Sequence, residues 1–193
     1  MKLVLKIFSL LLILTACADG ERTDETLEFE MENPQAAFLT NLSSLCGEWF
    51  SGESTYPDNP DHPLVATELR THISECDEDM VRIELYRDGD YWHGAWVLEM
   101  REEGLHLYHD HLGEVRTEEE LGDDDYTGYG GYADERGSAT FQFFPADDVT
   151  GEIIPEAATN VWMMDLDLEN GVFVYYLERH DEPRFRAELT LDE

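Results

Sequence analysis

Apolar and polar residues alternate with a period of two through most of the chain after Val81. Successive side chains of a β-strand point to opposite faces of a sheet, so this pattern predicts strands with one buried face. The apolar members of the runs are Val81, Ile83, Leu85, Trp92, Gly94, Trp96, Leu98, Met100, Leu105, Leu107, Ala139, Phe141, Phe143, Trp162, Met164, Leu166, Leu168, Phe185, Ala187, Leu189 and Leu191. A chain patterned in this way buries these side chains by building a sheet.

Short turn signals separate the runs, among them Asp88-Gly89-Asp90, Glu103-Gly104 and Asn170-Gly171. Asn-Gly between two strand patterns is the strongest short hairpin signal. Sequential hairpins that share one apolar face predict an all-β, antiparallel up-and-down β-barrel of about eight to ten strands, because closure removes exposed sheet edges. A twisted half-barrel or a sandwich is the alternative.

Three segments depart from the strand pattern. After Asn33-Pro34, apolar residues recur at helical spacing, which predicts a short helix ahead of the sheet; they are Phe38, Leu39, Leu42 and Leu45. The stretches 112–136 and 144–160 are rich in acidic residues, glycine or proline. They predict long connections, the second with a helical turn over one end of the barrel. Long loops on a rigid β scaffold often carry binding residues.

The N-terminus has the layout of a secretory signal peptide. Lys2 and Lys6 precede an apolar run over residues 7–14. This run is shorter than the roughly 20 apolar residues that cross a bilayer. The run ends in Leu14-Thr15-Ala16-Cys17, which resembles the bacterial lipobox. The resemblance implies cleavage before Cys17 and acylation of that residue, for instance with palmitate, and two or more acyl chains anchor a protein stably. An ordinary signal peptide followed by a chance cysteine is the alternative.

We therefore divide the chain into a signal peptide (1–16), an acidic lipid-anchored tether (17–33) and a single β-barrel domain (34–193). The tether is acidic and poor in apolar residues, which is typical of a solvated, flexible segment. Ala18, rather than Asp, follows the cysteine. In Gram-negative lipoproteins, which this chain resembles, that residue implies transport to the outer membrane, on its periplasmic or surface face.

The chain carries 45 Asp and Glu against 12 Lys and Arg, and its only lysines lie in the signal peptide. Such a negative surface repels nucleic acid and anionic lipid, which excludes phosphate-backbone binding. We expect a monomer whose membrane contact is its lipid anchor. Cys46 and Cys76 are expected to form a disulfide, since oxidative folding operates outside the cytoplasm. Two buried free thiols are the alternative.

Gly47-Glu48-Trp49 follows the expected helix, opens the first strand and resembles the Gly-x-Trp signature of lipocalins. The resemblance implies a barrel that binds a small apolar or amphipathic ligand, with Arg184 or Arg186 packed over Trp49. The stretches 105–111, 129–131 and 144–147 also resemble an uncharacterised group of secreted bacterial lipoproteins. That second likeness brings no known activity.

The candidate ligand-binding residues are Trp96, His109, His111, Phe141 and Trp162. His109 and His111 lie two residues apart and share one face of a strand, where two imidazoles could bind a metal ion. His93 is the expected third metal ligand, with His72 as another candidate. Hydrogen bonding of both histidines near the barrel rim is the alternative. Asp110, between them, is expected to point to the other face.

Other chemistry has little support in the sequence. The acidic stretch 118–125 lacks the spacing of an EF-hand, and we expect a solvated loop rather than a calcium site. Nucleophile-elbow, His-Glu-x-x-His, P-loop and dinucleotide motifs are lacking, so we expect a binding protein rather than an enzyme and assign no cofactor. The alternatives are a structural or envelope-interaction lipoprotein without a ligand, and a metal-binding protein or enzyme that uses His109 and His111.

The lipid should be the chain's one attachment to a membrane, because an acidic, lysine-free domain has no charge attraction for anionic lipid. Cys17→Ser is therefore expected to move the protein from the membrane pellet to the soluble fraction after cell fractionation, with an unchanged melting temperature. Persistent membrane association of this variant would contradict a lipid-only anchor.

Overall fold

The computed structural model describes residues 33–57, 64–65, 67–111 and 128–193. The signal peptide, Cys17, most of the tether and the acidic stretch 118–125 lie outside the described residues. No described helix combines the length and the apolar character needed to span a bilayer.

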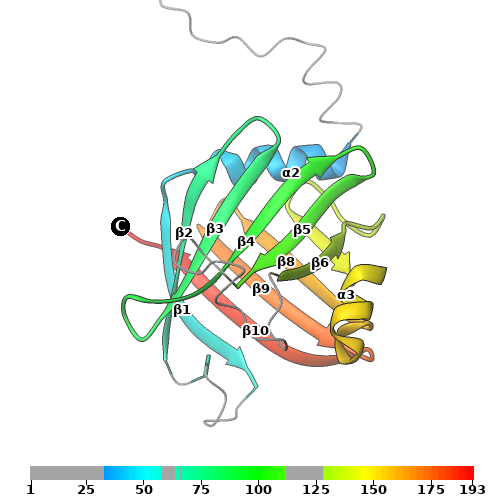
Figure 1. Cartoon of the computed structure of the whole chain (residues 1–193). Coiled ribbons are helices and arrows are strands. Elements are labelled where there is room, and N and C mark those ends of the chain that lie inside the picture. The colour runs from blue at the N-terminus through cyan, green and yellow to red at the C-terminus, as the bar shows by residue number, and fades with distance from the viewer. Residues whose placement is uncertain (1–32, 58–63, 66, 112–127) are drawn as a thin grey trace, which may run out of the picture.

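The described strands form one antiparallel, ten-stranded sheet that curls into a nearly closed up-and-down barrel (Figure 1). The strands are β1 Trp49–Tyr56, β2 Glu68–Cys76, β3 Met80–Arg87, β4 Tyr91–Arg101, β5 Gly104–Asp110, β6 Gly128–Tyr132, β7 Phe141–Pro145, β8 Asn160–Asp167, β9 Val172–Arg179 and β10 Glu182–Leu191. Sequence neighbours pair throughout, except that β1 also pairs with β10, while β6 and β7 stand at the two ends of the order. The predicted all-β barrel is confirmed.

The inner face of the barrel is apolar because alternate residues of the strands point inward. In β3, Val81, Ile83 and Leu85 are buried, whereas the residues between them are only half-buried. Other strands contribute Phe50, Leu69, Ile73, Leu98, Leu107, Met164, Leu166, Phe173 and Leu189 to the core. The period-two alternation therefore builds the core as predicted.

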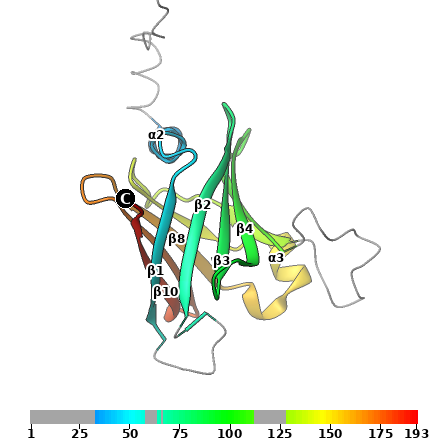
Figure 2. The same ribbon diagram turned by 90° about the vertical axis from the view of Figure 1, so that its left-hand side faces the viewer.

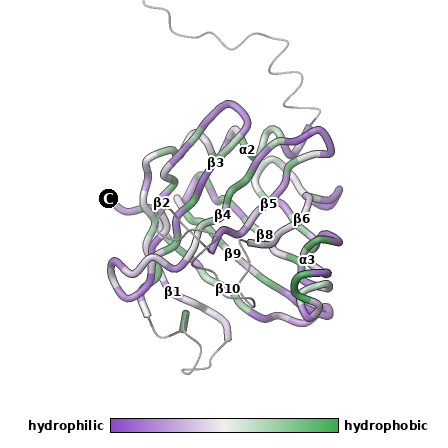
Figure 3. The backbone as a smooth tube through the Cα atoms, in the orientation of Figure 1, coloured by the Kyte–Doolittle hydropathy of each residue, from purple (hydrophilic) through white to green (hydrophobic). Residues whose placement is uncertain are grey.

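Tight turns with left-handed backbone join neighbouring strands. In the β3–β4 turn, Asp88 and Gly89 have φ values of 51° and 87°. In the β9–β10 turn, His180 and Asp181 have φ values of 56° and 60°. Two successive left-handed residues give a turn whose twist matches that of antiparallel strands. Figure 3 shows the β3–β4 and β4–β5 turns toward the hydrophilic end of the scale, as expected of exposed loop tips.

The helix α2 (Pro34–Ser43) lies across one end of the barrel (Figure 2). It begins at the predicted place because the Asn33 side chain accepts hydrogen bonds from the backbone N–H groups of Gln35 and Ala36. Pro34 suits the first turn of a helix, where its missing N–H costs nothing. The buried side chains of this helix, Phe38, Leu39 and Leu42, pack on the barrel core.

Polar contacts and a disulfide hold α2 on the barrel. The Gln35 side chain donates to Ala133 O at 3.1 Å and accepts from Leu105 N at 2.8 Å. Cys46, just after α2, forms a disulfide with Cys76 at the end of β2. The opposite end of the barrel, which we call the mouth, carries the β3–β4 and β9–β10 turns.

The barrel closes between β6 and β7, the two end strands of the sheet. Asp134 N donates to Phe143 O, and Asp147 N donates to Gly130 O, each at 3.0 Å. Between these bonds the backbones are so close that a Cβ on Gly131 would lie 1.8 Å from Pro145 O. The sequence wrongly predicted a connection throughout 112–136, because β6 is glycine-rich and shows no apolar alternation. The glycines are what this close approach requires.

A short helix, α3 (Asp148–Ile153), and a 3-10 turn, η2 (Pro155–Ala157), follow β7 and brace this seam. The Asp147 side chain caps α3 by accepting from Thr150 N at 2.7 Å. The buried Thr150 hydroxyl donates to Gly130 O and accepts from Gly130 N, both at 2.8 Å. Gly130 and Asp147 belong to two of the stretches that resemble secreted lipoproteins, so these motifs have a structural role in closing the barrel.

Thr150→Val keeps the side-chain shape but removes both hydrogen bonds to Gly130, which leaves buried backbone groups of β6 with fewer partners. We expect a loss of about 1–3 kcal/mol in the free energy of unfolding, measured by urea titration. Thr190→Val, on the exposed side of β10, is the matched control and should change stability far less. Equal effects of the two substitutions would contradict the role of Thr150 in closure.

Candidate functional site

Aromatic side chains from five strands meet inside the barrel. His109 of β5 lies beside Trp96 of β4 on one side and Tyr129 of β6 on the other. The ring centroids of Trp96 and Tyr175 are 4.4 Å apart, and those of Tyr129 and Trp162 are 5.6 Å apart. We call Trp96, His109, Tyr129, Trp162 and Tyr175 the inner aromatic cluster.

His109 is the polar centre of this cluster. Its side chain is only 8% exposed, and neither ring nitrogen has a hydrogen-bond partner. Gly94 on β4 makes room for the ring, since a Cβ there would lie 3.2 Å from His109 Nε2. Burial lowers the pKa of His109 well below its usual range, and the nearby His111 and His93 lower it further. The imidazole is therefore neutral, with one nitrogen able to donate and the other able to accept.

Trp96 and Tyr175 fill the barrel centre at this level. Trp96 is 2% exposed, and its buried indole nitrogen makes no hydrogen bond of normal geometry. The indole is nevertheless close enough to Tyr175 to lower the pKa of the Tyr175 hydroxyl. Burial raises the pKa of Tyr175 well above its usual range, Tyr129 adds to this rise and Trp96 opposes it.

The two predicted metal-binding histidines do come together. The ring centroids of His109 and His111 are 4.3 Å apart. His93 lies at a β-bulge in the β3–β4 ladder, and it is close enough to lower the pKa of His109. Among the described residues, however, no group of three or more His, Cys, Asp or Glu side chains is arranged to hold a metal ion. The metal site of His93, His109 and His111 stays a prediction, and the structure shows a tilted pair of imidazoles, His109 and His111, at its centre. Asp110 points outward as predicted, with Oδ2 2.8 Å from Arg82 Nη2.

Phe141 is the one predicted ligand-binding residue that lies on the wrong face. It sits opposite Asp165 in the ladder, packs against Phe143, and leaves the inward positions of β7 to Gln142 and Phe144. The phase of β7 was misjudged because Phe141, Phe143 and Phe144 make both of its faces apolar. Trp96, His109 and Trp162 are buried inside the barrel as predicted.

The Gly-x-Trp motif also differs from the expectation that the lipocalin resemblance raised. Trp49 pairs with His72 in the ladder and stacks on it at 4.2 Å, on the outer face of the sheet. The cation over Trp49 is Arg70 of the neighbouring strand, 4.5 Å from the ring centroid. The expectation that Arg184 or Arg186 covers Trp49 was wrong, since Arg186 binds Thr55 and Glu188 instead.

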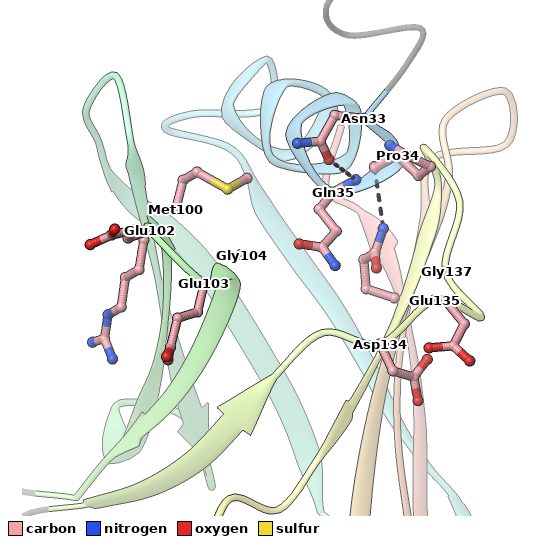
Figure 4. Close-up of a pocket in the computed structure, with 12 residues that line it drawn as sticks. Asn33, Pro34, Gln35, Met100, Glu102, Glu103, Gly104, Asp134, Glu135 and Gly137 are labelled. Atoms are coloured by element: carbon pink, nitrogen blue, oxygen red, sulfur yellow. Dashed lines mark hydrogen bonds between the residues drawn. The ribbon is translucent and has the colours of Figure 1, made fainter.

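A recess lies beside α2, at the end opposite the mouth. It has a volume of about 610 Å³, and Figure 4 shows Glu102 and Glu103 on one side with Asp134 and Glu135 on the other. Gln142 lines it and donates to Pro34 O and Ser138 O, which ties the helix start to β7. Its lining includes four carboxylates and the Arg101 guanidinium, which do not suit the apolar ligand expected from the fold.

Sequence reasoning missed Tyr129 and Tyr175. Tyr129 belongs to the glycine-rich β6, which carries no strand pattern. Tyr175 lies in the run from Val172 to Leu177, where every residue is apolar or aromatic and the alternation that separates inner from outer positions is lost. The buried partner of Trp96 could be identified only once the strands were placed.

A comparison with protein-family models and with curated proteins finds no match to this chain. The assignment of a site therefore depends on the geometry of the inner aromatic cluster.

The buried histidines should make the fold sensitive to mild acid. Burial lowers the pKa of His109, and also those of His106 and His111 despite opposing carboxylates. An unfolded chain binds these protons near pH 6.5, whereas the folded chain resists them, so stability present above that pH is lost as the pH falls below it. Each such histidine contributes a slope of about 1.4 kcal/mol per pH unit.

His109→Phe removes one such proton-binding group. The free energy of unfolding, measured by urea titration between about pH 6.5 and pH 5.5, should therefore change with pH less steeply, by about 1.4 kcal/mol per pH unit. Leu107→Met changes the next inward side chain of β5 without changing proton binding, and it should leave the slope unaltered. A slope that is the same in His109→Phe and the unsubstituted protein would mean that His109 is not buried in its neutral form.

Proposed function

We propose that this protein is a cell-envelope lipoprotein whose barrel binds a small apolar or amphipathic molecule at the inner aromatic cluster. The observation that carries the proposal is the His109 ring, which is buried while both of its nitrogens lack partners. A buried polar group without a partner costs about 1–3 kcal/mol, and native proteins rarely keep one without a reason. A ligand that hydrogen-bonds to His109 would remove this cost.

The surroundings of His109 support a ligand that is largely apolar. Aromatic rings flank it on the neighbouring strands, with the Tyr129 ring 5.0 Å away and the Trp96 ring 5.8 Å away. Ligand sites are usually lined by apolar and aromatic side chains with a few polar groups that fix orientation. In such a site, His109 would orient the ligand and the rings would supply the contact area.

The lipobox-like N-terminus supports the placement in the envelope. Cys17 would carry the acyl chains and the acidic tether would link them to the barrel. Residue 33 leads into α2, so the tether joins the barrel at the end opposite the mouth. A barrel held in this way would present the mouth away from its attachment point, where a ligand could enter.

Binding can be tested with N-phenyl-1-naphthylamine, an uncharged probe whose fluorescence rises in apolar surroundings. We expect saturable binding with one site per chain, and an organic extract of protein purified from cells should contain a bound molecule by mass spectrometry. His109→Trp places a larger ring between Trp96 and Tyr129 and should weaken probe binding by about tenfold, the effect of overfilling a packed site.

Tyr108→Trp is the matched control, because Tyr108 is the preceding residue of β5 and lies on the outer face. It should leave probe affinity unchanged, and both variants should melt as single cooperative transitions. Probe affinity that is equal in His109→Trp and the unsubstituted protein would place the probe outside the barrel and overturn the proposed site.

A further inference from the structure

The buried polar side chains of the described residues are hydroxyls, amides and imidazoles. They are Thr71, His106, His109, Gln142, Thr150 and Asn160, and none is Lys, Arg, Asp or Glu. Thr150 belongs to the seam, and His106 faces Asp147 on the outside of the barrel. The interior near His109 therefore offers no opposite charge to a buried ion.

Among the buried side-chain polar atoms of the described residues that have no hydrogen bond of normal geometry, those of Trp96 and His109 lie in the inner aromatic cluster. The Trp96 indole nitrogen can only donate, whereas a neutral imidazole at His109 donates from one nitrogen and accepts at the other. The charged and titratable groups around His109 are His111 on the same strand, His93 on β4 and Tyr129 on β6. Burial lowers the pKa of His109 and of His111, which favours the uncharged form of both imidazoles.

Two arginines in the inward phase of the described strands lie at the mouth, and both already make polar contacts. Arg179, at the end of β9, donates to Asn160 Oδ1 at 2.8 Å. Arg87, at the end of β3, contacts Asp88 Oδ2 at 3.2 Å and lies over the Tyr91 ring. Their hydrogen bonds hold them at the rim rather than against Trp96.

From these groups, and resting on the proposed function, we infer that the ligand is an uncharged lipid-like molecule whose hydroxyl or carbonyl oxygen binds Trp96 and His109. Such an oxygen accepts from the indole N–H and from the imidazole N–H, and a hydroxyl also donates to the second imidazole nitrogen. A fatty acid would have to bury its carboxylate without a compensating charge, which is strongly unfavourable.

The test compares ligands that share one chain and differ in the head group. Titration calorimetry with 1-dodecanol, dodecanoate and dodecylammonium at neutral pH should show that the alcohol binds more tightly than either ion by about tenfold or more, given the cost of burying an unpaired charge. Trp96→Phe removes the indole N–H but keeps an aromatic ring, and it should weaken dodecanol binding by about fivefold to tenfold, the usual effect of losing one hydrogen bond.

Trp92→Phe is the control on the same strand, because Trp92 bonds to Glu84 on the outer face. It should leave the preference for the alcohol unchanged. Dodecanoate that binds as tightly as dodecanol, and loses affinity in Arg179→Gln, would place an anionic head at the rim and overturn this inference while the proposed function stands. If none of the three ligands nor the naphthylamine probe binds, the proposed function itself fails.

Discussion

Closure of the sheet between β6 and β7 is the constraint on which the rest of this structure depends. Both strands are short, and they meet through backbone hydrogen bonds at each end with the close approach of Gly131 to Pro145 between them. Thr150 binds both backbone groups of Gly130 and holds α3 against this junction. An open seam would expose two strand edges and admit water beside Tyr129, which neighbours His109. Barrel closure and the proposed site are therefore coupled.

Once the sheet is closed, its interior is mostly apolar, but some of its buried polar atoms make no hydrogen bond of normal geometry. The aromatic rings supply contact area. His109 contributes two buried nitrogens without hydrogen-bond partners, and Trp96 contributes one without a hydrogen bond of normal geometry. Folding alone would favour apolar side chains at both positions, because unpartnered polar groups destabilise a core. The same groups become favourable when a molecule brings an oxygen to them. In the proposed function, the atoms that lower the stability of the empty barrel are the same atoms that bind the ligand.

The sequence predicted the fold well where alternation was clean and poorly where it was absent. The inward residues of β3 and β8 and the start of α2 at Asn33 follow from periodicity and capping, which are local properties. The strand β6 was missed because its glycines serve a contact with β7 that is distant in sequence. Phe141 was placed on the wrong face because both faces of β7 are apolar. The pairing of Trp96 with Tyr175 depends on strands β4 and β9 meeting across the interior, which no local pattern encodes.

In the proposed complex, a neutral His109 in the inner aromatic cluster donates a hydrogen bond to the oxygen of an uncharged ligand. The most direct measurement records the ¹⁵N chemical shifts of the His109 ring in labelled protein at about pH 7, with and without saturating 1-dodecanol. A neutral imidazole in both samples, with at least one nitrogen shifted by the alcohol, is the predicted result. A doubly protonated ring, or nitrogens that do not respond when dodecanol is bound, would contradict the account.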